Sequence, residues 1–233
     1  MRDDQVKDDN LKGASAGAVW DHYLELGNSK RLLYNLIAHF YRVFLIGPAF
    51  RYYMKRYFSS SSSLLHAGCG GGQVDAAVAG LFNITALDIS PNALELYKKE
   101  NGSNSRVCLG SIFNLPYQEN TFDGIYNLGV MEHFSRSEIE KILAEFKRVL
   151  KPGGKILLFW PPEFGLSVLF FKFLRSLLKV ILRREFKFHP DEISRLQSKE
   201  DGRRIIEKSG LKFKNYHFNW RDAFTYSVIL CEK

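Results

Sequence analysis

Residues 64–72 read Leu-Leu-His-Ala-Gly-Cys-Gly-Gly-Gly, an apolar run followed at once by a glycine-rich run. The apolar residues predict a short buried strand, and the glycines predict a tight turn. Residues 73–79 carry helix-forming side chains, so we expect a helix over 72–80. Glycine lets a ligand approach the backbone closely, and a helix N-terminus favours an anionic group. The stretch therefore predicts a strand, a ligand-binding loop and a helix.

The spacing of the glycines indicates which class of ligand the loop binds. Gly68, Gly70 and Gly72 form a Gly-x-Gly-x-Gly series, whereas the dinucleotide fingerprint would require glycine at position 73, where the chain has Gln73. A second apolar run ends on Asp88. A carboxylate at the tip of the second strand can accept hydrogen bonds from both hydroxyls of a ribose. The pattern favours a nucleoside ligand and argues against an NAD-linked dehydrogenase.

Together these motifs resemble the class I S-adenosylmethionine-dependent methyltransferases. Four later segments match, in order, that family's third-strand loop, fourth strand, post-strand segment and the start of the fifth strand: residues 110–117, 122–127, 130–134 and 150–159. The resemblance is carried by the middle of the chain, from about residue 60 to about residue 160.

Strands and helices alternate from residue 64 onward, which argues for a parallel sheet with helices on both faces. The resemblance implies an α/β fold with three layers. We expect a doubly wound, seven-stranded, mostly parallel sheet with an antiparallel closing strand, N-terminal helices and a helical insertion after strand five. Strands are predicted over 64–67, 83–88, 106–109, 122–127, 154–160, 211–219 and 223–231, and helices over 72–80, 91–100, 135–150 and 199–209. We divide the chain into a tail and helical cap over 1–63 and a methyltransferase domain over 64–233, with the insertion at 161–190.

Two segments outside the core pattern are rich in aromatic and basic residues. Residues 17–58 are expected to be helical, broken at Gly47-Pro48, with Trp20 and Tyr23 covering the cofactor or packing on the sheet. Residues 164–184 form an apolar stretch whose cations recur at three- and four-residue steps up to Lys187. This segment is open to three interpretations: a substrate lid, a membrane-surface helix, or a contact with a partner or second copy.

The resemblance also implies roles at the carboxyl ends of the strands. The glycine loop (Gly68, Cys69, Gly70, Gly72) would pass beneath the methionine part of S-adenosylmethionine, Asp88 would hold the ribose, and Ile89 would pack on the adenine. Ser111 and Ile112 would meet the adenine amino group and ring nitrogen, and Asn127 and Leu128 would line the same edge. The family often has an acid where His66 stands and Asp where Ser111 stands. His66 would therefore either hydrogen-bond through water or simply fill its position.

Methyl transfer needs a general base only when the acceptor must lose a proton. By resemblance, His133 is the best-placed candidate, although relatives with several acceptors carry Glu-His there. The Asn/Asp-Pro-Pro-aromatic signature of amino-group methylation is absent from residues 127–130, which read Asn-Leu-Gly-Val. O- or C-methylation is therefore preferred over N-methylation.

Composition sets the outer limits of the function. The 233 residues fit one α/β domain with additions, and three cysteines at unrelated spacings suggest neither disulfides nor a metal site. We see no signal peptide in residues 1–20 and no spanning helix, so we expect a cytoplasmic protein with contact to a membrane surface through 164–187 as an option. The net charge of +8 also keeps RNA methylation open as an alternative, but nucleic acid is disfavoured as a partner.

Our leading hypothesis is methyl transfer from S-adenosylmethionine, with S-adenosylhomocysteine as product, to a small lipophilic acceptor. The apolar insertion and the aromatic N-terminal segment motivate the word lipophilic. The alternative from another class is a noncatalytic protein that binds the cofactor or its product, which the substitutions at His66 and Ser111 would favour.

Overall fold

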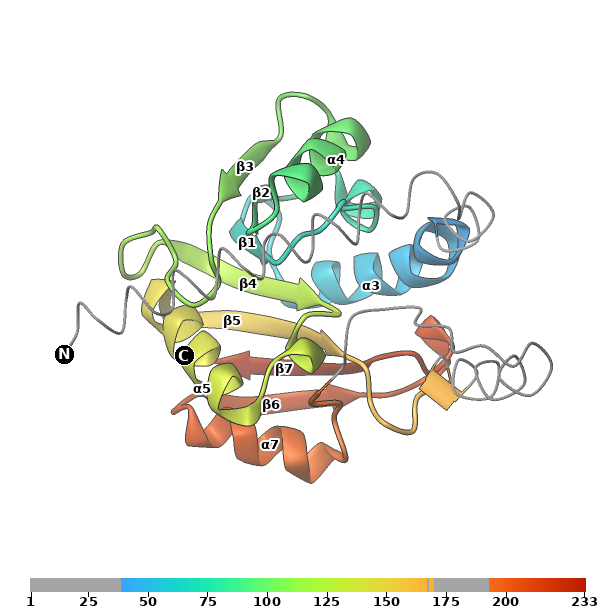
Figure 1. Cartoon of the computed structure of the whole chain (residues 1–233), viewed down its shortest axis with the longest axis vertical. Coiled ribbons are helices and arrows are strands. Elements are labelled where there is room, and N and C mark those ends of the chain that lie inside the picture. The colour runs from blue at the N-terminus through green and yellow to red at the C-terminus, as the bar shows by residue number, and fades with distance from the viewer. Residues whose placement is uncertain (1–38, 167, 170–192) are drawn as a thin grey trace, which may run out of the picture.

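A computed structural model describes residues 39–166, 168–169 and 193–233. The predictions for residues 1–38 and 170–192, including Trp20, Tyr23 and most of the insertion, lie outside these residues. Figure 1 shows the elements, whose bounds are η1 Arg42–Ile46, α3 Gly47–Tyr57, β1 Ser63–Ala67, η2 Asp75–Val78, β2 Asn83–Asp88, α4 Pro91–Asn101, β3 Arg106–Leu109, β4 Phe122–Leu128, η3 Met131–His133, α5 Arg136–Val149, β5 Leu150–Trp160, α7 Lys199–Lys208, β6 Lys212–His217, η4 Trp220–Asp222 and β7 Ser227–Glu232.

The strands form one seven-stranded sheet in the order β3-β2-β1-β4-β5-β7-β6. β1, β2, β3, β4 and β5 pair in parallel, and β7 runs antiparallel to both β5 and β6. The strand order reverses at β1 and β4, where open α/β sheets bind their ligands. The predicted fold, a mostly parallel sheet with one antiparallel closing strand, is confirmed.

Alternate residues of the central strands face opposite layers, as the two-residue period of a strand requires. Leu65 of β1 and Ile156 of β5 pack with α5 and α7, whereas Leu64 and Leu157, their neighbours in the chain, pack with α3. Figure 1 shows α5 and α7 together over the β5–β7 part of the sheet. Burial on both faces explains why these strands read as unbroken apolar runs in the sequence.

Helices α4 and α5 begin where their capping residues predict. The side chain of Ser90 accepts a hydrogen bond from Ala93 N, and Pro91 occupies the first turn of α4. Ser135 and Glu138 form the reciprocal capping box of α5. These local signals fixed both helix starts to within one residue.

The helix predicted over 72–80 is wrong in extent, because only the four residues of η2 are helical and they form a 3₁₀ turn. Gly72 and Gly80 both have positive φ angles, which an α-helix cannot contain, so the element cannot extend to either end of its predicted range. A turn this short provides no developed helix dipole. The expected anion site at a helix N-terminus is therefore missing from the described structure.

The break predicted at Gly47-Pro48 is also wrong. Residues 39–57 are continuously helical, with the π-helical turn η1 leading directly into α3. Gly47 N donates to Arg42 O, five residues back, and this wider turn precedes Pro48 in the first turn of α3. Proline has no N–H group, but the N–H groups in the first turn of a helix have no partner within the helix, so none is missed there. The helical segment therefore continues past Pro48.

Strand five begins earlier than predicted, at Leu150 instead of residue 154. Phe122 pairs with Leu150 and Gly124 with Lys155, so residues 151–154 bulge out between two paired positions. The bulge contains the sequence Lys151-Pro152-Gly153-Gly154.

Candidate functional site

The loops that follow β1, β2, β3 and β4 lie at the carboxyl edge of the sheet, because these strands pair in parallel. In Figure 1 the arrows of β4 and β5 end at this edge, on the right. The N–H groups of Gly68 and Cys69 both donate to Leu87 O of β2, at 2.8 and 3.0 Å. Gly110 N after β3 donates to Asp88 O at 2.9 Å. These backbone bonds hold the glycine loop and the ends of β2 and β3 together.

The three alternate glycines of the loop have positive φ angles: +75° at Gly68, +51° at Gly70 and +66° at Gly72. Their surroundings differ. A Cβ on Gly72 would lie 2.2 Å from the Tyr97 ring, so this glycine is needed for packing against α4. A Cβ on Gly70 would meet nothing within 4 Å. Gly70 therefore presents bare backbone to open space, which is the arrangement that a ligand approaching the chain requires.

Asp88 links the glycine loop to β2. Its Oδ2 accepts from Gly70 N at 2.8 Å and its Oδ1 accepts from Ser90 N at 3.0 Å. A carboxylate offers about four acceptor positions, so two remain for further donors. Burial raises the pKa of Asp88, and the Ser90 and Gly70 N–H groups oppose that rise. The carboxylate is thus fixed in orientation and able to accept two hydroxyl groups.

His66 lies in a buried polar cluster beneath the loop. The ring is 2% exposed, its Nδ1 is 2.8 Å from Asp75 Oδ2, and Tyr97 OH donates to the same oxygen at 2.7 Å. The His66 and Tyr126 rings contact each other at a tilt of 31°, with centroids 4.4 Å apart. The carboxylate that relatives often carry at position 66 is thus present nearby, on Asp75. Sequence reasoning missed Asp75 and Tyr97, although an acid inside the apolar run Val74–Val78 was a usable signal.

Ser111 and Ile112 follow β3 beside the end of β2. Ser111 Oγ accepts from Phe113 N at 3.2 Å, which leaves its O–H donor and further acceptor capacity. Ile112 is buried in the cluster that includes Leu87 and Leu115. Ile89, next to Asp88, is half-buried.

Asn127 lies at the end of β4 with 0% of its surface exposed. Neither its Oδ1 nor its Nδ2 has a hydrogen-bond partner among the described residues. Buried amides are nearly always paired, and leaving one unpaired costs about 1–3 kcal/mol. The next residue, Leu128, is half-buried, and a Cβ on Gly68 would lie 3.0 Å from Val130. The β1–β4 pairing sets Tyr126 opposite His66, so Asn127 lies beside Ala67, the residue before the glycine loop, and its amide has no partner among the described residues.

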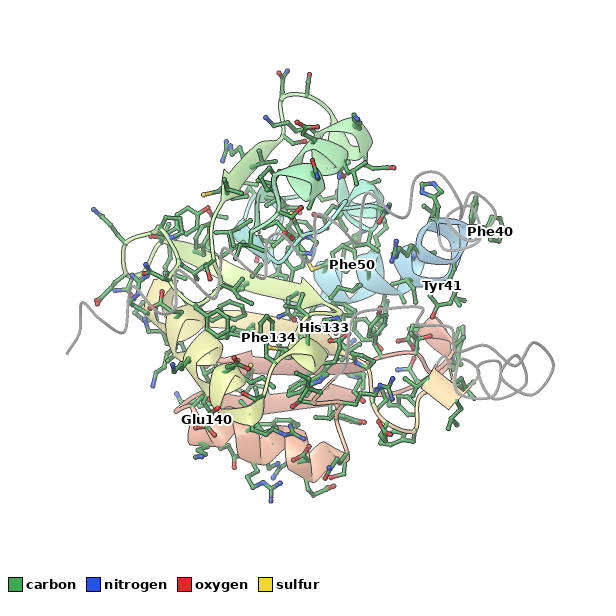
Figure 2. The ribbon with its side chains drawn as sticks, in the orientation of Figure 1. Phe40, Tyr41, Phe50, His133, Phe134 and Glu140 are labelled. Carbon is green, nitrogen blue, oxygen red and sulfur yellow. The ribbon has the colours of Figure 1, made fainter. Side chains whose placement is uncertain are left out.

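His133 lies farther along the same edge, in η3. Its Nε2 is 4.0 Å from Glu132 Oε1, and the two side chains are largely buried. Glu132 O accepts from Ile193 N and Ser194 N at 2.6 and 2.9 Å. Figure 2 shows His133 and Phe134 together in the middle of the molecule, between the sheet and the viewer.

Segments from both ends of the chain flank this edge. Arg42 Nη1 donates to Gln73 Oε1 at 3.5 Å, and the hydroxyls of Tyr41 and Thr225 are 2.5 Å apart. The structure thus brings the predicted residues 66–72, 88–89, 111–112 and 127–128 to one edge, with His133 on the side of β5 and β7. Their contacts with a ligand stay predictions.

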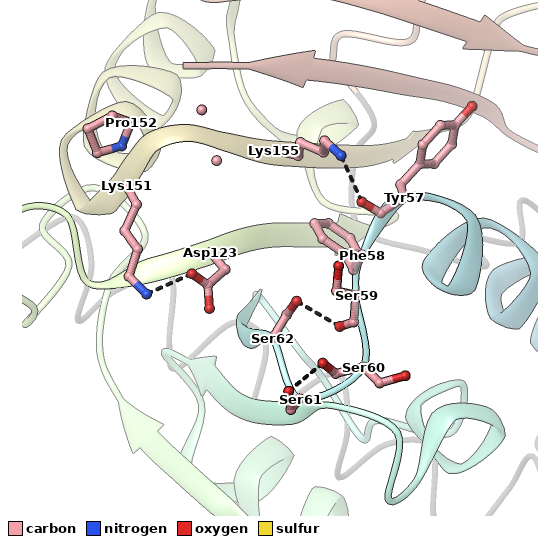
Figure 3. Close-up of a pocket in the computed structure, with 12 residues that line it drawn as sticks. Tyr57, Phe58, Ser59, Ser60, Ser61, Ser62, Asp123, Lys151, Pro152 and Lys155 are labelled. Carbon is pink, nitrogen blue, oxygen red and sulfur yellow. Dashed lines mark hydrogen bonds and ion pairs between the residues drawn. The ribbon is translucent and has the colours of Figure 1, made fainter.

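A hollow of about 450 Å³ lies at the opposite, amino edge of the sheet. Figure 3 shows its lining, which includes residues 57–62, Asp123 and residues 151–155. Lys151 Nζ is 2.6 Å from Asp123 Oδ1, and Lys155 Nζ donates to Tyr57 O at 3.2 Å. Ser62 Oγ donates to Ser59 O at 2.7 Å.

No helix among the described residues is long and apolar enough to cross a membrane.

Comparison with known proteins agrees with this geometry. The model of the methyltransferase domain family matches residues 65–158. The demethylmenaquinone methyltransferase of Bacillus licheniformis is 26% identical over 175 residues, which are 67% of this chain and 73% of that protein. The 24-methylenesterol C-methyltransferase 3 of Arabidopsis thaliana is 33% identical over 98 residues, which are 39% of this chain and only 27% of that longer protein.

Solved structures share the fold. The 1,6-didemethyltoxoflavin-N1-methyltransferase of Burkholderia thailandensis superposes with a TM-score of 0.63 at 15% identity, covering 94% of this chain and 88% of that one. The matched model, the strand order and the glycine loop facing the Asp88 carboxylate lead to one conclusion: residues 65–158 form a methyltransferase domain, within a sheet that has the fold of solved S-adenosylmethionine-dependent methyltransferases.

Proposed function

We propose that the chain transfers the methyl group of S-adenosylmethionine to a lipophilic acceptor, at carbon or oxygen. The single observation that carries the cofactor assignment is the orphaned amide of Asn127 at the edge where the glycine loop and Asp88 meet. A buried amide without a partner is stabilised when a bound polar molecule supplies one.

The residues present fit the cofactor. Asp88 has acceptor capacity left for the two ribose hydroxyls. The open side of Gly70 admits the methionine part, and Asn127 offers both a donor and an acceptor to its polar end. Ile89 would lie on the adenine, with Ser111 accepting from its amino group and the N–H of Ile112 serving a ring nitrogen.

S-adenosylmethionine supplies a methyl group that its sulfonium already activates, so the protein's work is mainly to hold the acceptor in line with it. His133 lies on the acceptor side with its ring near Glu132. In this proposal it takes the proton of an acceptor hydroxyl, or of an acidic carbon, when one must be lost.

Two relatives support a lipophilic acceptor, because their names describe enzymes acting on a demethylmenaquinone and on a sterol carbon. The flanking segments of this chain also expose apolar side chains near the acceptor side, among them Phe164 and Phe224.

Calorimetric titration with S-adenosylmethionine, S-adenosylhomocysteine and NADH tests the cofactor, on the wild type and on Asp88→Ala. We expect binding of the two sulfur ligands, its loss in the variant, and no binding of NADH. Transfer of labelled methyl to a prenylated quinol, a sterol, a primary amine and RNA then tests the acceptor. Labelling of the amine or RNA in preference to the two lipids would contradict the proposed class.

The noncatalytic alternative gives a different result in the same experiments. It predicts tight binding of the sulfur ligands without transfer to any acceptor. Its support is the replacement at positions 66 and 111, but the Asp75 carboxylate held against His66 weakens that support, because the site keeps an acid there.

A further inference from the structure

Exposed apolar side chains are concentrated on one face of the molecule. Ten large apolar side chains are exposed among the described residues, and eight of them come from three short segments. We call these eight the aromatic face: Phe40, Phe44, Tyr52, Phe164, Leu166, Leu169, Trp220 and Phe224. Trp220 is 70% exposed, Phe44 63% and Phe40 61%. Soluble surfaces rarely gather such groups in one patch without an interaction to explain it.

Direct contacts make the face continuous. The guanidinium of Arg221 lies 4.4 Å from the Tyr52 ring centroid and 5.1 Å from that of Trp220. The Phe218 ring lies 5.0 Å from Phe164 and 5.3 Å from Phe224. Leu166 N donates to Phe224 O at 3.0 Å. The segment after β5 and the β6–β7 turn therefore form one surface.

The N-terminal helix completes this surface. The rings of Phe40 and Phe44 contact each other at a tilt of 33°, with centroids 4.4 Å apart. The hydroxyl of Tyr41, the residue after Phe40, is hydrogen-bonded to that of Thr225 in the β6–β7 turn. Figure 2 shows Phe40 at the outer edge of the molecule, whereas Phe50 of the same helical segment points toward the sheet. One side of the helix thus packs on the domain, and the other side extends the aromatic face.

The charge of the face is positive. Residues 39–58 contain four cations, Arg42, Arg51, Lys55 and Arg56, and no Asp or Glu. Arg221 adds a fifth, while its neighbour Asp222 is buried. Glu163, near Phe164, is paired with Arg195 at 3.3 Å. The face therefore presents exposed aromatic rings interleaved with arginines.

We propose that the aromatic face docks on an anionic lipid surface. Trp and Tyr favour the membrane–water boundary, Phe and Leu enter the acyl region, and arginines attract acidic headgroups while their stems lie along apolar surface. A second copy of the chain fits less well, because a twofold contact sets the same patch against itself and would oppose cations without carboxylates. Leu166 and Leu169 cannot stack on bases, which disfavours single-stranded RNA.

The placement has a consequence for the reaction. The aromatic face lies on the same edge of the sheet as His133 and the carboxyl end of β5, so a lipid acceptor could pass from the bilayer to the site without crossing water. This consequence rests on the proposed function, but docking itself does not, and it can be tested without an acceptor.

The test is sedimentation of the full chain with vesicles of phosphatidylcholine, with and without phosphatidylglycerol. Two double variants probe the face: Phe44→Ala with Trp220→Ala removes apolar contact, and Arg56→Glu with Arg221→Glu reverses charge. Lys98→Glu with Lys99→Glu makes the same charge change in the last turn of α4, and Leu109→Ala removes an exposed apolar side chain at the β3 edge. A cooperative urea-unfolding transition, followed by circular dichroism, shows that each variant is folded.

We expect the wild type to bind only the acidic vesicles, and less as salt is raised. Each face variant should lower the partition coefficient by about tenfold or more, and the two controls should leave it unchanged. Equal binding to neutral vesicles, no binding, or equal loss in the Lys98/Lys99 control would overturn the proposal. A dimer that the Phe44/Trp220 variant dissociates would assign the face to a second copy, and RNA that displaces the vesicles would assign it to nucleic acid. If the wild type binds acidic vesicles but transfers no methyl group to any acceptor tested, the proposed function is contradicted and the docking proposal stands.

Discussion

The two edges of the sheet both carry polar groups, but the hydrogen bonds of these groups differ: those at the amino edge are paired within the protein, and those at the carboxyl edge are partly unpaired. At the amino edge, Lys151 is paired with Asp123, Lys155 with a carbonyl, and Ser62 with the main chain. At the carboxyl edge, Asn127 has no partner among the described residues, and Asp88 keeps unused acceptor capacity. The polar groups named at the amino edge therefore already have hydrogen-bond partners within the protein.

The difference teaches that unmet hydrogen-bonding capacity is a better guide to a ligand site than the size of a hollow. A polar group that the protein has already paired gains little from a ligand, because binding must first break the internal bond. A buried group without a partner gains the full bond. We therefore expect substitutions at the carboxyl edge to change binding and those at the amino edge to change only stability.

The largest effect should come from Asp88→Ala. Removing the carboxylate takes away two bonds to the ribose and the anchor of the Gly70 N–H, and bonds to a charged group are worth about 1.5–3 kcal/mol each. The affinity for S-adenosylhomocysteine, measured by calorimetry, should fall by about a hundredfold or more. Asp123→Ala at the amino edge is the control and should leave that affinity unchanged. A similar loss of affinity in both variants would contradict the proposed difference between the two edges.

A second test compares two glycines with the same backbone strain. Gly70 and Gly80 have φ angles of +51° and +72°, and a Cβ on either would meet nothing within 4 Å. Alanine should destabilise the fold by about 1–2 kcal/mol at both positions. Only Gly70→Ala should also weaken cofactor binding, by about tenfold, because its methyl group would occupy the ligand's space. Unchanged binding in Gly70→Ala would mean that the ligand does not approach this loop.

Asn127→Leu should raise the stability of the unliganded protein by about 1 kcal/mol, because it removes an unsatisfied buried amide. The same change should also lower the affinity for the cofactor. Asn101→Leu is the matched control, since the Asn101 amide donates to Gly72 O and Tyr97 O, and this change should lower stability. Urea unfolding of both variants measures the change in the free energy of unfolding, which should be positive for Asn127→Leu and negative for Asn101→Leu. A destabilised Asn127→Leu would show that the amide is already satisfied.

The smallest effect is expected from Asp123→Asn at the amino edge. Lys151 lowers the pKa of Asp123 in the folded protein, so the ionised carboxylate stabilises the fold above its unfolded pKa of about 3.9. That contribution, about 0.5 kcal/mol for a half-exposed pair, disappears as the pH falls through the lower folded pKa. Urea unfolding at pH 7 and near pH 3 should show the difference from wild type shrinking in acid. A difference that grows in acid would contradict this account.

Local signals predicted much of the fold. The strand bounds of β2 and β3 and the starts of α4 and α5 followed from apolar runs and from caps formed within a few residues. The carboxyl-edge position of Asp88 followed from parallel topology, because every strand end then lies on the same side. These features depend on neighbours in sequence and are therefore readable from it.

The failures involve partners distant in sequence. The sequence suggests that an acid is lost at position 66. In the structure the Asp75 carboxylate lies against His66, 9 residues away in the chain, and Tyr97, 22 residues from Asp75, donates a hydrogen bond to it. Gly72 was read as a loop glycine for the ligand, whereas the Tyr97 ring already excludes a side chain at that position. The orphaned state of Asn127 depends on everything packed around it, so no sequence pattern could have indicated it.

The position of β7 between β5 and β6 sets an order of events during synthesis on the ribosome. The first five strands can pair as they emerge, but β6 leaves the ribosome before β7, which is the one strand it pairs with among the described residues. Until β7 arrives, the edge of β5 stays open and can pair with other chains. A pause or a stop codon between β6 and β7 should therefore trap a nascent chain with an exposed strand edge, and chaperones would be needed most over that short interval.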